Sequence, residues 1–209
     1  MGRPLTLSGL LAVLAIAGSA MGQTAGPQAK MEGKIDRFTL SPSGTPDGFL
    51  FDSGLEVHFH RYLGKQLSTT LKRGELVQVE GTHLVAQHVV LASSVTDLVN
   101  GQHLDDKGEM GVQAQNTGTG TTASADGLVK TLLHGSQGQV DGVILDNDTM
   151  VRLPSGVPAI LPNLMAVGAH LAVSGQQLDT ENGRVIRIES MGPSSSELTA
   201  LQQSSVGQQ

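Results

Sequence analysis

One short stretch of the sequence, FLFDSGLEVHFH at residues 49–60, carries most of the side chains that could do chemistry. It places Glu56, His58 and His60 at alternate positions, and alternate residues of a β-strand point to the same side of a sheet. Two neutral imidazoles on one side suit zinc or copper. The pattern therefore indicates metal binding by His58 and His60 as one candidate chemistry, although two ligands are too few for a tight site and the sequence indicates no third.

The same stretch holds three of the four phenylalanines of the chain, and two of them, Phe49 and Phe51, stand before its turn. Ser53 and Gly54 read as a two-residue hairpin turn, which would pair Phe49 with His58 across the hairpin and turn both outward. A set of apolar and polar side chains on one outer face is the kind of surface that binds a ligand. The predicted ligand-binding residues are Phe49, Phe51, Glu56, His58 and His60.

Three interpretations of this face stay open. The face could be covered by the other half of the molecule, by the connecting segment or by a partner subunit, because exposed apolar patches are normally covered or functional. It could bind a protein, peptide or saccharide. The third interpretation is the metal site at His58 and His60.

No enzyme template is met elsewhere in the sequence. The chain has no cysteine, so it has no thiol nucleophile, and it has no G-x-S-x-G motif. Asp47 and Asp52 recur as Asp141 and Asp146 in a second copy, at turn positions that suit aspartate for backbone reasons. We predict that the protein is not an enzyme and needs no cofactor, and a hydrolase is the least favoured alternative.

Charge and composition weigh against nucleic acid as a partner. The formal net charge is −6 and only 2% of the residues are aromatic, whereas phosphate binding needs a basic surface. The run Phe59-His60-Arg61-Tyr62 could stack on a base, but single-strand binding needs several aromatic side chains along a positive groove. Single-stranded nucleic-acid binding is therefore kept as an unfavoured alternative.

Residues 1–22 have the pattern of a secretory signal peptide. Arg3 supplies the positive start, an apolar run extends from Leu5 to Ala17, and Ala20-Met21-Gly22 offers a cleavage site before Gln23. The competing interpretation is an uncleaved anchor, for which the apolar run is short. No second stretch is long and apolar enough to span a membrane, so we predict an exported protein, periplasmic or extracellular, without a transmembrane segment in its mature form.

The rest of the chain contains an internal repeat. Residues 33–81 align without gaps with residues 127–175, so that turn glycines and apolar positions meet 94 positions apart. After a two-residue insertion the copies rejoin, with Val89 against Val185. A repeat that matches in turns and apolar alternation indicates one module folded twice. The identical positions of the first copy are Gly33, Gly44, Asp47, Gly48, Asp52, Val57, Leu67, Gly74, Val79 and Gly81.

Each copy predicts the same order of elements. In the first copy the expected strands are residues 34–40, 48–52, 55–60, 76–81 and about 88–93, with a helix between 62 and 71 where leucines recur every four residues. The second copy has two prolines in the matching segment, which favour a short helix or an irregular turn. This order is typical of the OB-fold, with an SH3-type barrel as the alternative. We predict an all-β protein of two tandem five-stranded Greek-key barrels, each with a short helix or turn between its third and fourth strands.

The predicted domain organisation follows from the repeat and from composition. Polar, Gly- and Thr-rich residues separate the two modules, and Ser- and Gln-rich residues end the chain. The predicted parts are a signal peptide (1–22), module 1 (31–96), a flexible linker (97–125), module 2 (126–192) and a disordered tail (193–209).

Two segments carry a resemblance to a known group of proteins. LKRGELVQVEGTHLVAQHVVLASSV in module 1 and LMAVGAHLAVSGQQLDTENGRVIRIESM in module 2 resemble the repeated module of a bacterial exported family of unknown function, whose pattern is L-x-x-G-x-x-V-x-V-x-G followed by an apolar strand. The resemblance implies fold and export and assigns no functional residue. With the composition, it predicts a non-catalytic binding or scaffolding protein of the cell envelope; the alternative is a periplasmic metal-binding protein using His58 and His60.

Overall fold

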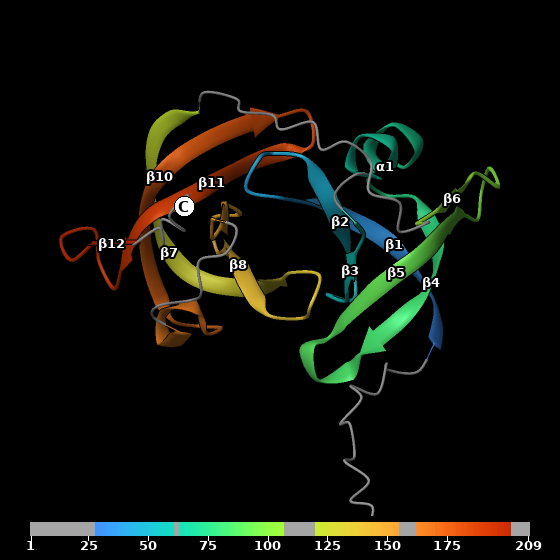
Figure 1. Ribbon diagram of the computed structural model, residues 1–209, viewed down its shortest axis with the longest axis horizontal. Helices are drawn as coiled ribbons and strands as arrows, with labels where there is room; N and C mark the ends of the chain where they lie inside the picture. Colours follow the sequence, from blue (N-terminus) through green and yellow to red (C-terminus); the bar gives the residue numbers. More distant parts are fainter. Residues whose placement is uncertain (1–27, 61–62, 107–119, 155–161, 202–209) are drawn as a thin grey trace, which may run out of the picture.

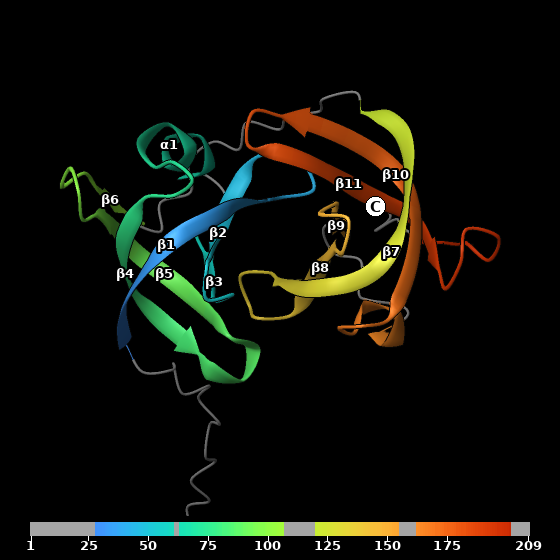
Figure 2. The same ribbon diagram turned by 180° about the vertical axis from the view of Figure 1, so that it is seen from behind.

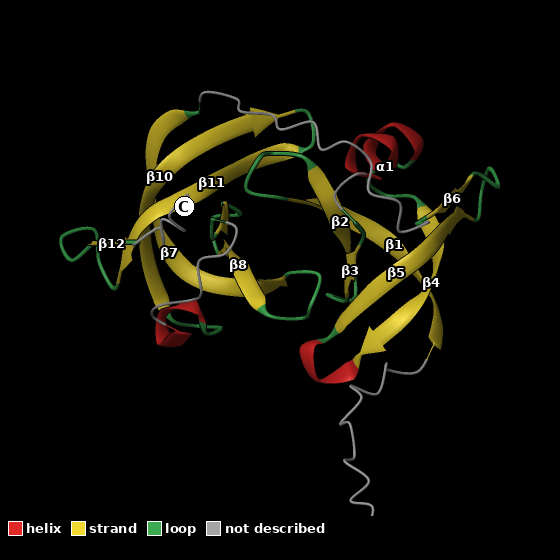
Figure 3. Ribbon diagram, viewed as in Figure 1, coloured by secondary structure: helices red, strands yellow, loops and turns green. Residues whose placement is uncertain are grey.

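The computed structural model describes residues 28–60, 63–106, 120–154 and 162–201. The predicted signal peptide lies outside the described residues, as do the middle of the predicted linker and residues 202–209 of the predicted tail. The described chain is built almost wholly of strands, with few helical turns between them (Figure 3). Within this part of the chain, no helix has the length and apolar character needed to cross a membrane.

The first half of the chain folds into a closed barrel, called barrel 1 here. Strand β1 pairs antiparallel with both β2 and β4, and the parallel pairing of β3 with β5 closes the ring. This strand order and the helix between the third and fourth strands are those of an OB-fold, as predicted. Its elements are β1 (Gln28–Leu40), β2 (Pro46–Phe51), β3 (Glu56–His58), α1 (Gly64–Thr70), β4 (Leu76–Leu84), the 3₁₀-helix η2 (Val85–Gln87), β5 (Val89–Asp97) and the appended β6 (His103–Asp105).

The second half repeats the same topology as barrel 2, which lies beside barrel 1 (Figures 1 and 2). Strand β7 pairs with β8 and β10, and the parallel pairing of β9 with β11 closes the ring. The prediction of two tandem five-stranded barrels is confirmed. The elements are β7 (Thr121–His134), β8 (Val140–Leu145), β9 (Met150–Arg152), the 3₁₀-helix η3 (Pro162–Met165), β10 (His170–Thr180), β11 (Gly183–Gly192) and the appended β12 (Thr199–Ala200).

The segment after the third strand differs between the barrels, and the sequence explains why. In barrel 1, Leu63, Leu67 and Leu71 are all buried, and their spacing of four places them on one face of α1. In barrel 2, the described part of the matching segment is only the single turn η3, which begins at Pro162. Proline has no backbone N–H to donate, so it is favoured only at the start of such a turn.

The hairpin between β2 and β3 has a register one residue away from the predicted one. Phe51 donates its N–H to the carbonyl of Leu55, and Gly54 adopts φ +82°. The loop is therefore three residues long and ends in a left-handed glycine, a common hairpin type. Phe49 pairs with Val57 instead of His58, and a shift of one residue moves every side chain to the other face.

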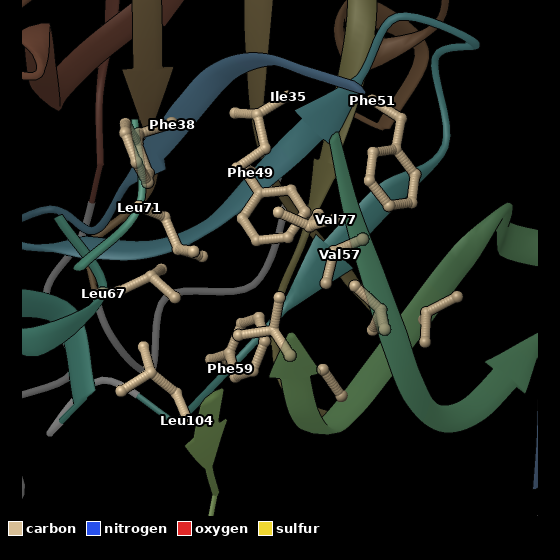
Figure 4. Packing of buried hydrophobic residues seen from close by; sticks show 14 of the residues in the cluster. Ile35, Phe38, Phe49, Phe51, Val57, Phe59, Leu67, Leu71, Val77 and Leu104 are labelled. Atoms are coloured by element: carbon tan, nitrogen blue, oxygen red, sulfur yellow. The ribbon is translucent and has the colours of Figure 1, made fainter. Parts of the chain in front are cut away.

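The corrected register places the aromatic side chains inside barrel 1. Phe49 and Phe51, predicted to face outward, are 0% and 2% exposed and lie in the same core as Phe38 and Phe59 (Figure 4). The ring centroid of Phe49 is 5.5 Å from that of Phe51 and 5.9 Å from that of Phe59. The outward aromatic surface predicted from the sequence does not form, because these rings build the core.

Strands also occur inside two of the segments that the sequence places outside the modules. Strand β6 pairs with β5, and β7 begins at Thr121, so both ends of the predicted linker 97–125 belong to the sheets. Strand β12, inside the predicted disordered tail 193–209, pairs with β11. The first half of β7 is largely exposed and pairs only with β10, so its Thr, Ser and Ala residues show little of the apolar alternation that marks a strand in a sequence.

Candidate functional site

The faces formed by β2 and β3 in barrel 1 and by β8 and β9 in barrel 2 point toward each other. Where they meet, apolar side chains from both barrels form a cluster separate from the two barrel cores. In the OB-fold the outer face of the second and third strands is the usual ligand surface. In this protein each barrel covers that surface of the other. The buried members of the cluster are Leu40, Leu50, Leu133, Ile144, Met150 and Val185.

A buried arginine joins the two barrels. Arg152 on β9 is 0% exposed, and its Nη2 donates to both carboxylate oxygens of Asp47 on β2 at 3.1 Å. Its Nη1 donates to Asp141 and its Nε to the carbonyl oxygen of Leu40 at 2.8 Å. Thr39 donates a further hydrogen bond to Asp47 at 2.8 Å. Asp47 and Asp141, predicted at turn positions, therefore lie in strands and share one guanidinium between the barrels, whereas Asp52 and Asp146 lie in turns as predicted.

The electrostatics of this cluster depend on its burial. Burial raises the pKa of Asp141, and the charge of Arg152 works against that rise. Burial alone would lower the pKa of Arg152, but Asp47 and Asp141 together raise it. A guanidinium with two carboxylates is thus kept charged at the centre of the interface, where its hydrogen bonds replace lost water.

A second polar contact involves Glu56, one of the predicted ligand-binding residues. Both oxygens of its carboxylate accept the backbone N–H of His134 at 3.1 Å, and one lies 2.8 Å from His134 Nδ1. Both residues are buried, at 2% and 6% exposure. Glu56 therefore faces outward from barrel 1, as predicted, but it contacts barrel 2, and its partner His134 was not predicted.

The contacts between the barrels are reciprocal. Leu40 of barrel 1 donates its N–H to the sulfur of Met150 of barrel 2 at 3.2 Å. In the repeat, Leu40 corresponds to His134 and Met150 corresponds to Glu56. His134 of barrel 2 donates its N–H to Glu56 of barrel 1, so the same bond is made from barrel 2 to barrel 1. Reciprocity of this kind is the mark of a twofold arrangement of like surfaces.

The loops at the two ends of the interface follow the same rule. A Cβ added to Gly44 would contact Leu178, and one added to Gly138 would contact Leu84. Gly44 and Gly138 are 94 positions apart, and so are Leu84 and Leu178. The quasi-twofold relation therefore extends across the whole interface.

His58 takes the place in barrel 1 that Arg152 takes in barrel 2. Its Nδ1 is buried and has no hydrogen-bond partner within the described part of the chain. Burial lowers the pKa of His58 and outweighs the nearby charge of Asp47, which acts in the opposite direction. Glu56, Asp141 and Arg152 also act on it, with smaller effects.

The lowered pKa of His58 predicts a pH dependence of stability. Below pH 6.5, the ordinary value, the unfolded chain takes up a proton that the folded chain does not, so the free energy of unfolding falls as the pH falls toward the lowered pKa. We expect His58→Gln to lessen this fall, as measured by urea unfolding at a series of pH values. His88→Asn, at an exposed left-handed turn position, is the matched control. An unchanged slope in His58→Gln would contradict the prediction.

His60 does not lie in the buried interface. It is exposed, and both its backbone N–H and its Nδ1 are 2.8 Å from Asp106 Oδ2. Among the described residues, no three His, Cys, Asp or Glu side chains gather as metal ligands would. Metal binding by His58 and His60 stays a prediction from the sequence.

A groove of about 430 Å³ opens where the two barrels meet beside α1. Its barrel 1 side carries the cations Arg37, Lys72 and Arg73, and its barrel 2 side is the β10–β11 turn with Glu181 and Asn182. The turn and the helix lie next to each other in both views (Figures 1 and 2). Sequence reasoning did not find these residues, since they lie apart along the chain.

Comparison with known proteins identifies no family for this chain. No family model and no curated protein matches it. It is similar to two crystal structures of the single-stranded DNA-binding protein from Thermus aquaticus: a deletion mutant (15% identity, 84% of this chain and 94% of that one, TM-score 0.24) and the wild type (14%, 86% and 96%, TM-score 0.25). At these TM-scores the likeness carries no argument about a ligand, and the assignment of the barrels rests on their strand pairing.

Proposed function

We propose that the chain is an exported, non-catalytic binding protein of the cell envelope in which two OB-like barrels act as one body. Export rests on the signal-like pattern of residues 1–22, and the single body rests on the burial of the β2–β3 and β8–β9 faces against each other. Arg152 and Glu56, charged side chains of a kind that could bind a ligand, instead form ion pairs within this interface. A partner must then be met at another surface, and the groove beside α1 is a surface to which both barrels contribute.

Two observations favour a partner other than nucleic acid. All four phenylalanines are buried in barrel 1, so none is presented for stacking on a base, and stacking is a main source of affinity for single strands. The net charge of −6 also opposes the approach of a phosphate backbone.

Export is tested by following the N-terminus in a bacterial host. We expect the chain outside the cytoplasm to begin at Gln23, as found by mass spectrometry of its first peptide. Leu11→Arg should hold the protein in the cytoplasm, because a charge interrupts the apolar run that the export machinery recognises. Leu11→Ile keeps the run apolar and is the matched control. A wild-type chain that stays cytoplasmic with its first residues intact would overturn the proposal.

A further inference from the structure

The duplication provides an internal control for the groove. Some residues that hold the two barrels together recur in both copies, as Asp47 and Asp141 do at the buried arginine. The three cations of the groove do not recur: 94 positions after Arg37, Lys72 and Arg73 stand Thr131, Ala166 and Val167. Barrel 2 therefore folds without cations at these positions. Arg37 has a structural role in its contact with Asp148 of barrel 2, so Lys72 and Arg73 are the two cations that call for another reason.

The turn on the other side of the groove shows the same contrast. Allowing for the two-residue insertion, Glu181 and Asn182 of the β10–β11 turn correspond to Val85 and Ala86 of barrel 1. Of the two quasi-equivalent places where the barrels meet, one is therefore charged and polar, and the other carries apolar side chains. Val85 and Val167 are 67% and 65% exposed. Both barrels therefore carry charged or polar residues on the side of the interface where the groove lies and apolar residues at the corresponding positions on the other side. A ligand site shared by the two barrels would require this.

The cations of the groove differ in how firmly they are held. Arg37 is fixed by two carboxylates, at 3.2 Å from Asp36 and 3.1 Å from Asp148. Arg73 has one contact, 3.2 Å to Asp36, and its side chain is 69% exposed, so this ion pair is weak and replaceable. The Lys72 ammonium makes no ion pair with any described residue. Arg73 and Lys72 are thus available to an anionic group that enters the groove.

The opposite wall limits what that ligand can be. Glu181 projects a carboxylate that has no cation partner among the described residues, and it would repel a polyanion. A carboxylate in a binding site accepts hydrogen bonds from hydroxyl groups. Ser68 and Asn182 add hydroxyl and amide groups, and Phe38 also lines the groove. A compact molecule with one or two carboxylates and several hydroxyl groups satisfies these walls, because a small acid can place a carboxylate on Lys72 and Arg73 while its hydroxyls lie toward Glu181.

We propose that the groove beside α1 binds an acidic saccharide, whose carboxylate lies against Lys72 and Arg73 and whose hydroxyls donate to Glu181. The volume of about 430 Å³ is within the range of small-molecule sites. The inference rests on the proposed function, since it names the ligand class of that binding protein. The proposed site lies outside the β2–β3 face, in a groove between the two barrels. That groove exists only because the module is duplicated.

The test measures binding of digalacturonate, maltose and inorganic phosphate to the mature chain by isothermal titration calorimetry. We expect digalacturonate to bind and the other two to bind at least about tenfold more weakly, because hydrogen bonds to charged groups are among the stronger polar contacts. The double variant Lys72→Ala/Arg73→Val carries the residues that barrel 2 has at these positions, so it should fold normally and lose about tenfold or more in affinity for digalacturonate. Lys30→Ala, on an exposed pair with Glu80, is the matched control and should keep full affinity.

The outcomes separate this inference from the function on which it rests. Equal binding of maltose would overturn the role of the carboxylate, and equal binding of phosphate would overturn the saccharide. Unchanged affinity in a folded double variant, checked by its thermal unfolding, would overturn the location. An exported chain that binds no digalacturonate overturns the inference alone, whereas a chain retained in the cytoplasm overturns the proposed function.

Discussion

Replacing Arg152 by alanine should lower the free energy of unfolding by about 3–5 kcal/mol, the usual cost of removing one partner from a buried ion pair. The change leaves Asp47 buried without its counter-charge and the carbonyl of Leu40 without its donor. Natural domains are stable by only about 5–15 kcal/mol, so a loss of this size is a large part of the whole. Urea unfolding followed by circular dichroism measures it.

A matched control separates burial from charge. Arg184 forms an ion pair with Asp179 at 2.7 Å, but both side chains are about 60% exposed, and Arg184→Ala should cost less than about 1 kcal/mol. Adding Asp47→Asn to Arg152→Ala should recover part of the loss, because the orphaned charge is gone. Equal losses in Arg152→Ala and Arg184→Ala would show that the interface does not depend on the buried guanidinium.

Replacing Phe49 by alanine should cost about 3–5 kcal/mol, since a large ring is removed from a closed core. Its contacts with Phe51 and Phe59 add about 0.5–1.5 kcal/mol each beyond buried area. The same substitution on an exposed face would change stability by less than about 0.5 kcal/mol. Urea unfolding therefore decides between the two registers of the β2–β3 hairpin.

The comparison for Phe49 is an apolar side chain that is exposed. Val85, at 67% exposure, should tolerate alanine with almost no change in the urea midpoint. A Phe49→Ala variant that unfolds at the same urea concentration as Val85→Ala would contradict the three-residue loop and the core built on it.

The repeat and the strand order could be predicted from the sequence because they depend on many residues at once. Turn glycines and apolar alternation recur over the length of each module, so an error at one position does not change the topology. The hairpin register depends on a single loop. Ser53 and Gly54 suit a two-residue turn, and the third loop residue, Asp52, suits a turn equally well.

One signal in the sequence did favour the correct register. With a three-residue loop, Phe49 and Phe51 fall on the same face as Leu55, Val57 and Phe59. All the aromatic and most of the aliphatic side chains of the hairpin are then on one side, which is what a closed barrel requires. The two-residue loop divides them between both faces.

The interface could not be predicted because it depends on how two folded bodies meet. Glu56 and His134 are 78 positions apart, and Arg152 and Asp47 are 105 apart. No periodicity relates such residues, since each belongs to a different barrel. The groove cations could have been noticed as positions where the two copies disagree in charge, a comparison that needs no structure.

The reciprocal interface has a consequence for how the protein behaves when it is scarce. A self-complementary pair of separate subunits comes apart on dilution. Joining the two copies in one chain makes their association intramolecular, so each barrel is always present at a high effective concentration around the other. The paired state then holds at any concentration, so a site built from both barrels stays assembled in a single molecule.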